Sequence, residues 1–245
     1  MNQDMKFDLH IHSHKSYDSV ASVQNIIRNA KRQGLSGIAM TDHEVLASED
    51  VVDLAKENNI WIIRGIEAKT DIGDIIGLFV SKEIKSRKAD ILIDEIHDQG
   101  GIAILAHPFK YMKRIDHYPT KLIEKMDAIE VVNARWEDLR LFPKNQMVHK
   151  LLSAVQGRSA GSDSHFPLEV GRAYWTTPPL SSPEELKESI RANKGEAISA
   201  SFSKWLDGPS QFVKFLKKPT LKQIARMAYW SSRRVVVGKR TIPNE

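Results

Sequence analysis

The sequence predicts an α/β fold in which mainly parallel strands form a closed or distorted TIM-like barrel. Short apolar runs alternate with amphipathic stretches from residue 7 to residue 200, and such strand–helix alternation is typical of a parallel sheet covered by helices. Histidines and acids follow these runs, as functional residues do at the carboxyl ends of barrel strands. A doubly wound open sheet is the alternative. No glycine-rich phosphate loop follows any predicted strand, which argues against a nucleotide-cofactor enzyme.

Apolar periodicity and capping residues assign the elements in chain order. Strands are expected at residues 7–11, 37–41, 61–66, 75–80, 102–106, 128–132, 157–161 and 197–200, and helices at 23–30, 51–58, 90–99, around 122, 145–155 and 183–192. The first helix carries apolar side chains at helical spacing. The last helix follows a capping box formed by Ser182 and Glu185, with Pro183 at its first position.

The composition limits the class of protein. A chain of 245 residues with 41% hydrophobic residues can bury one substantial core. The absence of cysteine excludes disulfides and cysteine-based zinc sites, so a metal site must use His, Asp and Glu. Residues 1–6 lack the pattern of a signal peptide, and no apolar run approaches the ~18 residues of a membrane span. We therefore expect a cytoplasmic protein without a transmembrane segment.

The charge divides the chain into a barrel domain, residues 1–200, and a basic C-terminal extension, residues 201–245. The extension has ten Lys/Arg and two Asp/Glu residues, a net charge of +8, whereas residues 1–200 have 26 basic and 29 acidic residues, a net charge of −3. An apolar helical face in the extension is formed by Leu221, Ile224, Ala225, Ala228 and Tyr229. Three interpretations of this helical tail remain open. It packs on the barrel, contacts nucleic acid with salt-sensitive affinity, or lies on an anionic membrane surface.

Histidines and carboxylates cluster at the ends of the predicted strands. The set is His10, His12, His43, Glu67, His107, Asp163 and His165. His10 and His12 are two residues apart in an extended segment, so their side chains lie on the same side, and Asp8 precedes them as a candidate supporting acid. Imidazole nitrogens and carboxylate oxygens are ligands of zinc, manganese and iron. The set therefore predicts a multinuclear metal hydrolase. The remaining histidines, His14, His97, His117 and His149, are expected at the surface, with His14 as a candidate border of the substrate site.

Five segments, in this order along the chain, resemble the PHP (polymerase and histidinol phosphatase) superfamily of metal-dependent phosphoesterases. They are residues 8–19, 41–43, 65–67, 106–108 and 161–165, and the resemblance covers residues 6–175. It implies a distorted (β/α)7 barrel with a site for two or three divalent ions of manganese, zinc or iron.

The resemblance also implies how the ligands divide among the ions. His10, His12, Glu67 and Asp163 would hold one ion, Glu67 would bridge to a second ion shared with His107, and Asp18, His43 and His165 would hold a third. Many relatives place a histidine shortly before a glycine after the Glu67 segment, whereas this chain has Asp74 there. A carboxylate in this place would favour harder ions such as manganese. Asp71 is a second candidate for the same role.

The implied reaction is hydrolysis of a phosphate ester by a metal-bound hydroxide, because divalent ions lower the pKa of bound water toward ~7. Arg172 is the preferred cation for the phosphate, with Arg135 and Lys110 as alternatives. Whichever of His165 and His43 is not fully committed to metal would protonate the leaving group. The chain has no cysteine and no Gly-x-Ser-x-Gly segment, which argues against acyl-enzyme chemistry.

The expected substrate is a phosphorylated small molecule or an oligonucleotide, so the enzyme would be of the 3′,5′-bisphosphate nucleotidase or 5′-3′ exonuclease type. Histidinol phosphate is the alternative substrate within the superfamily. A non-catalytic nucleic-acid-binding module that uses the basic tail is an alternative of another class. An amidohydrolase on a similar barrel usually has a lysine as the bridging ligand. Glu67 fills that place here, which favours phosphoester chemistry.

Overall fold

The computed structural model describes residues 3–108, 110, 118–141, 146–200, 212–213 and 215–217. Its strands are β1 (Met5–Ile11), β2 (Gly37–Met40), β3 (Trp61–Lys69), β4 (Asp74–Leu78), β5 (Ile102–Leu105), β6 (Ala128–Asn133), β7 (Glu137–Asp138), β8 (Gly157–Gly161), β9 (Ala173–Thr177) and β10 (Glu196–Ser199). Its helices are α1 (Val23–Arg32), α2 (Asp50–Glu57), α3 (Ala89–His97), α4 (Thr120–Ile123), α5 (Gln146–Ala154) and α6 (Pro183–Arg191). The predicted alternation of strands and helices is confirmed.

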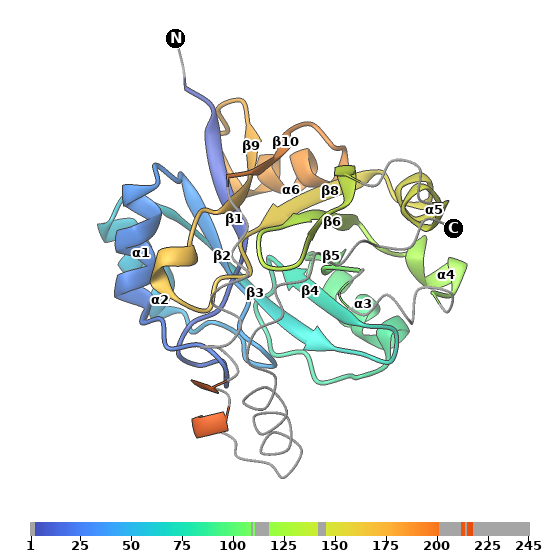
Figure 1. Ribbon diagram of the computed structural model, residues 1–245, viewed down its shortest axis with the longest axis horizontal. Helices are drawn as coiled ribbons and strands as arrows, with labels where there is room; N and C mark the ends of the chain where they lie inside the picture. Colours follow the sequence, from blue (N-terminus) through green and yellow to red (C-terminus); the bar gives the residue numbers. More distant parts are fainter. Residues whose placement is uncertain are drawn as a thin grey trace, which may run out of the picture.

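A distorted barrel forms from seven of these strands in the order β1-β2-β3-β4-β5-β6-β8 (Figure 1). The barrel closes between β8 and β1, where the N–H of Asp163 donates to the carbonyl of His10 at 2.8 Å and the N–H of His12 donates to the carbonyl of Ser164 at 2.9 Å. A Cβ atom at Gly161 would collide with His10, so glycine permits this close approach. The closure agrees with the predicted barrel and not with a doubly wound open sheet.

Two features differ from the predicted parallel arrangement. β4 is antiparallel to both β3 and β5, because the residues 70–73 that join β3 to β4 are too few for the crossover that parallel strands need. β9, which the sequence analysis missed, pairs antiparallel with β1, and β10 pairs antiparallel with β9. The predicted strand at 197–200 therefore lies at the edge of the sheet, beyond β9, and is not part of the barrel.

Helices cover the barrel on several sides, with α1 and α2 on one side and α3, α4 and α5 on another (Figure 1). Beneath α1, the buried side chains of Ile26 and Ile27 pack in one cluster with Ile38 and Met40 of β2. A larger cluster joins the other strands to α3 and α6. Ser22 precedes α1 as its N-cap, and its hydroxyl accepts the N–H of Asn25.

A bulge in β1 directs the end of this strand toward the barrel interior. Asp8 lies opposite Ile38, and Ile11 lies opposite Met40, so the register shifts by one residue between them. Because Ile38 and Met40 face α1, Asp8 and Ile11 lie on the outer side of the strand. The two residues between them both lie on the inner side, which is the effect that a bulge has beside many functional sites. His10 is one of these two inward residues.

No helix among the described residues is both long and apolar enough to cross a bilayer. Most of the basic extension, including the predicted apolar helix face at 221–229, lies outside the described residues. The parts of the extension that the structure describes, 212–213 and 215–217, are helical.

Candidate metal centre at the barrel rim

The nine predicted ligands gather at one rim of the barrel. They are His10 and His12 at the end of β1, Asp18 in the loop that follows, His43 after β2, Glu67 in β3, Asp74 at the start of β4, His107 after β5, and Asp163 and His165 after β8. Parallel strands end at a common rim. β4 runs in the opposite direction and begins there, so its first residue, Asp74, reaches the same place.

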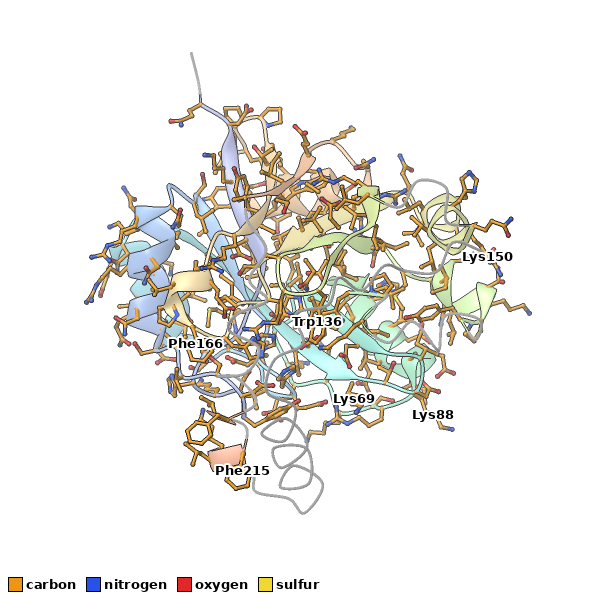
Figure 2. All side chains as sticks on the ribbon, viewed as in Figure 1. Lys69, Lys88, Trp136, Lys150, Phe166 and Phe215 are labelled. Carbon is orange, nitrogen blue, oxygen red and sulfur yellow. The ribbon has the colours of Figure 1, made fainter. Side chains whose placement is uncertain are left out.

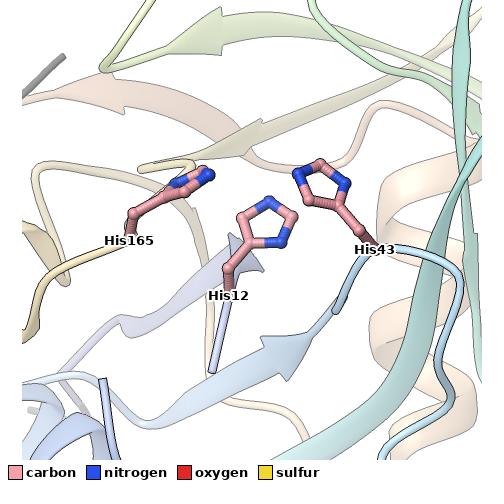
Figure 3. A group of neighbouring side chains, drawn as sticks. All are labelled: His12, His43 and His165. Carbon is pink, nitrogen blue, oxygen red and sulfur yellow. The ribbon is translucent and has the colours of Figure 1, made fainter. Parts of the chain in front are cut away.

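Ligand atoms of these residues form four overlapping groups, each with all its atoms within 4.8 Å of one another. The groups are His10–His12–Glu67, His10–His107–Asp163, Glu67–Asp74–His107 and His12–His43–His165. Figure 3 shows the last group, in which three imidazole rings from three separate segments lie together. Two of the groups, His10–His12–Glu67 and Glu67–Asp74–His107, follow the division implied by the family resemblance. In the other two, His107 lies with His10 and Asp163, and His12 lies with His43 and His165. Such groups fit divalent metal ions.

Asp18, in the loop after β1, lies beside His43 and His165 of the His12–His43–His165 group. Its Oδ2 lies 3.3 Å from Nε2 of His43, and its Oδ1 lies 3.3 Å from Nε2 of His165. Burial raises the pKa of the Asp18 carboxyl, but the charges of the two histidines and hydrogen bonds with them outweigh burial and lower it. Asp18 is therefore an anion between two imidazoles, as a metal ligand at this position would be.

The buried carboxylates and imidazoles at the centre shift one another's pKa values. Burial raises the pKa of Glu67, but His43 and His10 outweigh it and hold that pKa well below its ordinary value. Burial lowers the pKa of His43, but Glu67 and Asp18 outweigh it and raise the pKa to about 10. Burial, together with His43 and His165, lowers the pKa of His12 to about 3. The carboxylates therefore hold protons on some of the imidazoles when no other cation neutralises them.

The hydrogen bonds around His10 and His12 direct their Nε2 atoms into the cluster. Glu130 lies 2.9 Å from Nδ1 of His10. Ser16 Oγ lies 3.2 Å from Nδ1 of His12 and accepts a hydrogen bond from it, because the Ser16 hydroxyl itself donates to Asp42 at 2.6 Å. The two Nε2 atoms are then 3.1 Å apart. Their lone pairs can lie this close when a proton or a metal ion is bound at one of them.

Glu67 supplies a second sign of fit to a cation. Its Oε2 is buried and makes no hydrogen bond among the described residues. Nevertheless, Nδ1 of His43 is 2.7 Å away and Nε2 of His12 is 3.4 Å away. Because imidazole nitrogens surround this oxygen, a divalent ion placed between them could bind the oxygen and the nitrogens together.

Glu130 is a site residue that the sequence analysis missed. It is 1% exposed, and besides His10 it accepts the backbone N–H of His107 at 2.8 Å and the side-chain amide of Asn133 at 2.9 Å. Acids that hold the second nitrogen of a histidine fix the orientation of metal ligands. The available signal was a single acid within the apolar strand segment 128–132.

Asp42 has the corresponding role beside His12. Its carboxylate accepts the N–H and the hydroxyl of Ser13 at 2.7 and 2.6 Å, as well as the hydroxyl of Ser16. Asp42 thereby ties the loop after β1 to the end of β2. Its position directly before His43 was the signal in the sequence.

The cations predicted to bind phosphate have different places in the structure. Nζ of Lys110 lies 3.7 Å from Oδ2 of Asp74 and 4.6 Å from the ring centroid of Trp136, beside the cluster. Figure 2 labels Trp136 near the middle of the barrel, and its indole N–H donates to Asp163 at 2.9 Å. Arg135 forms a buried ion pair with Glu169.

Arg172 lies directly before β9, and the bonds described for it are made by its backbone with Glu169 and Ala200. Its role as a phosphate clamp stays a prediction. Nζ of Lys110 lies beside the side chain of a candidate ligand, Asp74, whereas Nε of Arg135 donates to the backbone carbonyl of Asp163 at 3.1 Å.

Residues outside the cluster mostly follow the predictions. The carboxylate of Asp71 accepts the N–H of Ala89 at the start of α3, so it caps a helix. His149 is exposed, and His97 bonds Asp127 at 2.8 Å. His14 is exposed and borders a pocket beside His43, whereas His117 lies outside the described residues.

Asp8 supports the seam between β1 and β8, the line along which these two strands close the barrel. Its carboxylate accepts the N–H groups of Ser162 and Gly171, both at 2.8 Å.

Two candidate ligands have backbone conformations with positive φ, 26° for His107 and 53° for Asp163. Such conformations cost about 1–3 kcal/mol each for residues other than glycine, and they cluster at functional sites. The hydrogen bonds of Glu130 with His107 and of Trp136 with Asp163 hold both residues in place.

Comparison with known proteins agrees with this geometry. The family model of the PHP domain matches residues 8–158, and a PHP-associated model matches residues 158–194. An uncharacterized protein of Methanocaldococcus jannaschii is 35% identical over 147 residues, which cover 55% of this chain and 85% of that protein. A 5′-3′ exoribonuclease of Haemophilus influenzae is 39% identical over 67 residues, 27% of this chain and 24% of that protein.

Solved structures share the fold. The lesion-specific endonuclease of Pyrococcus furiosus superposes with a TM-score of 0.58 at 16% identity, covering 80% of this chain and 58% of that chain. A Bifidobacterium adolescentis protein described as a metal-dependent phosphoesterase superposes with a TM-score of 0.55 at 13% identity, covering 77% and 96%.

Proposed function

Because this chain belongs to the PHP domain family, and is thus a metal-dependent hydrolase, we propose that it hydrolyses a phosphate ester of a nucleotide or short oligonucleotide. The observation that carries the proposal is the convergence of His, Asp and Glu side chains in overlapping groups at one rim of the barrel. These groups share ligands, so ions bound in them would be close neighbours. Close pairs of ions are typical of phosphoester hydrolysis.

We assign the ligands in three groups. His10, His12, Glu67 and Asp163 would hold one ion; Glu67, Asp74 and His107 would hold a second; Asp18, His43 and His165 would hold a third. Bound divalent ions would supply Lewis acidity, which polarises a phosphoryl group and lets water ionise near neutral pH. The mixture of carboxylate and imidazole ligands suits manganese, zinc or iron.

Lys110 is our candidate for the cation that binds the substrate phosphate. Its ammonium lies 3.7 Å from Asp74, itself a candidate ligand, so a phosphate at the cluster would lie within reach. The side chain of Lys110 is 14% exposed, and partial burial strengthens an ion pair with phosphate relative to water. Arg135 suits this role less well, because its guanidinium is paired with Glu169.

His43, where it is not committed to the third ion, is our candidate for the group that protonates the leaving oxygen. Its side chain is 14% exposed, more than those of His10, His107 or His165. A general acid needs access to both the substrate and a source of protons. The pocket beside His43 offers that access. His165, which is 7% exposed, is the alternative.

The choice of a nucleotide or oligonucleotide rests on the relatives. A nuclease name occurs for one sequence relative and for one structural neighbour. Each likeness covers part of the proteins or has low identity, so the substrate is a proposal and the fold is the shared property.

The proposal is tested by hydrolysis with manganese-loaded protein. The panel is an aryl phosphate, a nucleoside 3′,5′-bisphosphate, a short 5′-phosphorylated RNA and histidinol phosphate. Asp163→Ala and His165→Ala remove ligands, and His97→Ala is the matched control because His97 bonds Asp127 outside the cluster. We expect turnover of the bisphosphate or RNA by the wild type and His97→Ala, and none by the ligand variants. Turnover of histidinol phosphate alone would overturn the nucleotide assignment, and inactivity of metal-loaded wild type on the whole panel would overturn the phosphoesterase assignment.

A further inference from the structure

A lysine from the C-terminal extension binds the loop that carries Asp18. Nζ of Lys217 donates to the backbone carbonyls of His14, Ser16 and Ser19 at 2.9, 3.0 and 2.6 Å. Figure 2 labels Phe215 in the same short segment, which lies apart from the barrel strands. A contact thus joins two parts of the chain that are about 200 residues apart.

The chemistry of this contact suits a clamp. An ammonium group has three N–H donors and no acceptor, and three carbonyl oxygens meet it here. Three carbonyl dipoles that point at one place repel one another unless a cation or water lies between them. Because the carbonyls belong to residues on both sides of Asp18, the ammonium holds the curvature of this loop.

The clamped loop is linked to the candidate ligands by further bonds. The Ser16 hydroxyl lies between His12 and Asp42. The Ser19 hydroxyl lies 2.9 Å from the carbonyls of both His12 and His165. Asp18 itself contacts His43 and His165. A change in the path of this loop would therefore move Asp18 away from its two imidazole partners.

We propose that Lys217 is a positioning residue that sets the geometry of the Asp18 loop, so that metal binding at the Asp18–His43–His165 group depends on the C-terminal extension. This inference rests on the proposed metal-dependent function. It predicts that the other two groups, which take no ligand from this loop beyond His12, keep their metals without the clamp.

The extension also borders the approach to the same group. A pocket of about 440 Å³ is lined by residues of the Asp18 loop, by His43 and by Lys217. Loss of the Lys217 contact would therefore loosen the loop and change the wall of this pocket together. One segment of chain thus affects both a ligand and the space next to it.

The test uses the full chain with Lys217→Met, which keeps the length of the side chain and removes its donors. Lys187→Met is the matched control, because Nζ of Lys187 also donates to a backbone carbonyl, that of Gly100 at 2.7 Å, away from the cluster. Asp18→Asn serves as the positive control for loss of the third ion. Manganese binding is measured by titration with element analysis, and hydrogen exchange is measured at the amide of His14, which donates to Ala21 at 2.7 Å.

We expect Lys217→Met to weaken one manganese site by about 10–100-fold, the range for loss of a supporting contact at a metal site. The remaining sites should be unchanged, and exchange at His14 should be faster. Exchange within β5 reports whether the barrel itself stays folded. Wild-type affinity at every site, or slow exchange at His14, in folded Lys217→Met would overturn the inference. Failure of the wild type to bind any metal would instead overturn the proposed function, so the two failures are distinguishable.

Discussion

Two groups of buried charges lie under the same rim and differ in how they are satisfied. Arg135 and Glu169 have side chains 3% and 2% exposed and form an ion pair at 2.7 Å. The Glu169 carboxylate also accepts the N–H groups of His165 and Phe166. Glu67 is equally buried, yet one of its oxygens makes no hydrogen bond among the described residues. Protein groups alone satisfy the first set, whereas imidazole nitrogens from separate segments face the second, an arrangement that fits a bound metal ion. The first is built for stability of the loop, and the second for binding.

Breaking the satisfied pair should have the largest effect on stability. Arg135→Met leaves the Glu169 carboxylate buried without its partner, and loss of one member of a buried ion pair costs about 3–5 kcal/mol. Urea unfolding of the metal-free protein measures this loss. Lys56→Met is the control, since Lys56 and Asp53 form an ion pair with both side chains 74% exposed, which is worth about 1 kcal/mol or less. Similar losses for the two variants would contradict the distinction between the two groups.

Breaking the unsatisfied group should instead remove activity and preserve the fold. Glu67→Gln removes a charge that both of the first two ions would share, and ions contribute several kcal/mol to transition-state stabilisation. We expect phosphoester hydrolysis to fall about 10³-fold, equivalent to about 4 kcal/mol. The metal-free variant should lose less stability toward urea than Arg135→Met, because the imidazoles that pair with Glu67 can release their protons when its charge is lost. An active Glu67→Gln enzyme with its full set of metals would show that Glu67 is not a bridging ligand.

Asp8 is an intermediate case that can be tested by pH. Its carboxylate is buried and hydrogen-bonded, like that of Glu169, but no cation pairs with it among the described residues. Burial raises the pKa of its carboxyl from 3.8 to about 6, although hydrogen bonds with Ser162 and Gly171 act in the opposite direction. The folded state therefore binds the proton more tightly than the unfolded state. The charge of Asp8 disfavours folding above pH 6, and this penalty disappears as the pH falls from 6 to about 4.

The pH effect is measured against Asp8→Asn, which cannot titrate. The difference between 3.8 and about 6 corresponds to about 3 kcal/mol. The stability of the wild type relative to Asp8→Asn should therefore increase by about this amount as the pH falls through that range. A difference in stability that does not change with pH would show that Asp8 has an ordinary pKa in the folded protein.

The smallest expected effect concerns Glu130, whose carboxylate is fully hydrogen-bonded and orients His10 in the candidate metal centre. Glu130→Gln weakens its hold on Nδ1 of His10, and changes of this kind typically lower metal affinity about 10–100-fold. Manganese titration measures the change, with Glu188→Gln as the control because Glu188 is 67% exposed. Unchanged manganese affinity would mean that His10 keeps its orientation without this acid.

The strand-end ligands could be predicted because their types and positions are local properties of the sequence. The antiparallel direction of β4 could have been expected from the short connection at 70–73, and it explains why Asp74 reaches the rim. The bulge in β1 could not be predicted, because it depends on pairing with β2 and leaves no local pattern. Glu130 was missed for a related reason: its role depends on contacts with His10 and His107, which lie on other strands.

The seam between β1 and β8 has a consequence for folding. Asp163 and His10 share a backbone hydrogen bond where these strands meet, and both are candidate ligands of one ion. Residues so far apart in the chain come together late, after the local hairpin of β3 and β4 can form. The last step of barrel closure is therefore also the step that assembles the ligand set. In a chain whose barrel has not closed, the candidate ligands lie far apart. Metal uptake should therefore follow barrel closure, and its rate should measure the rate of that last step.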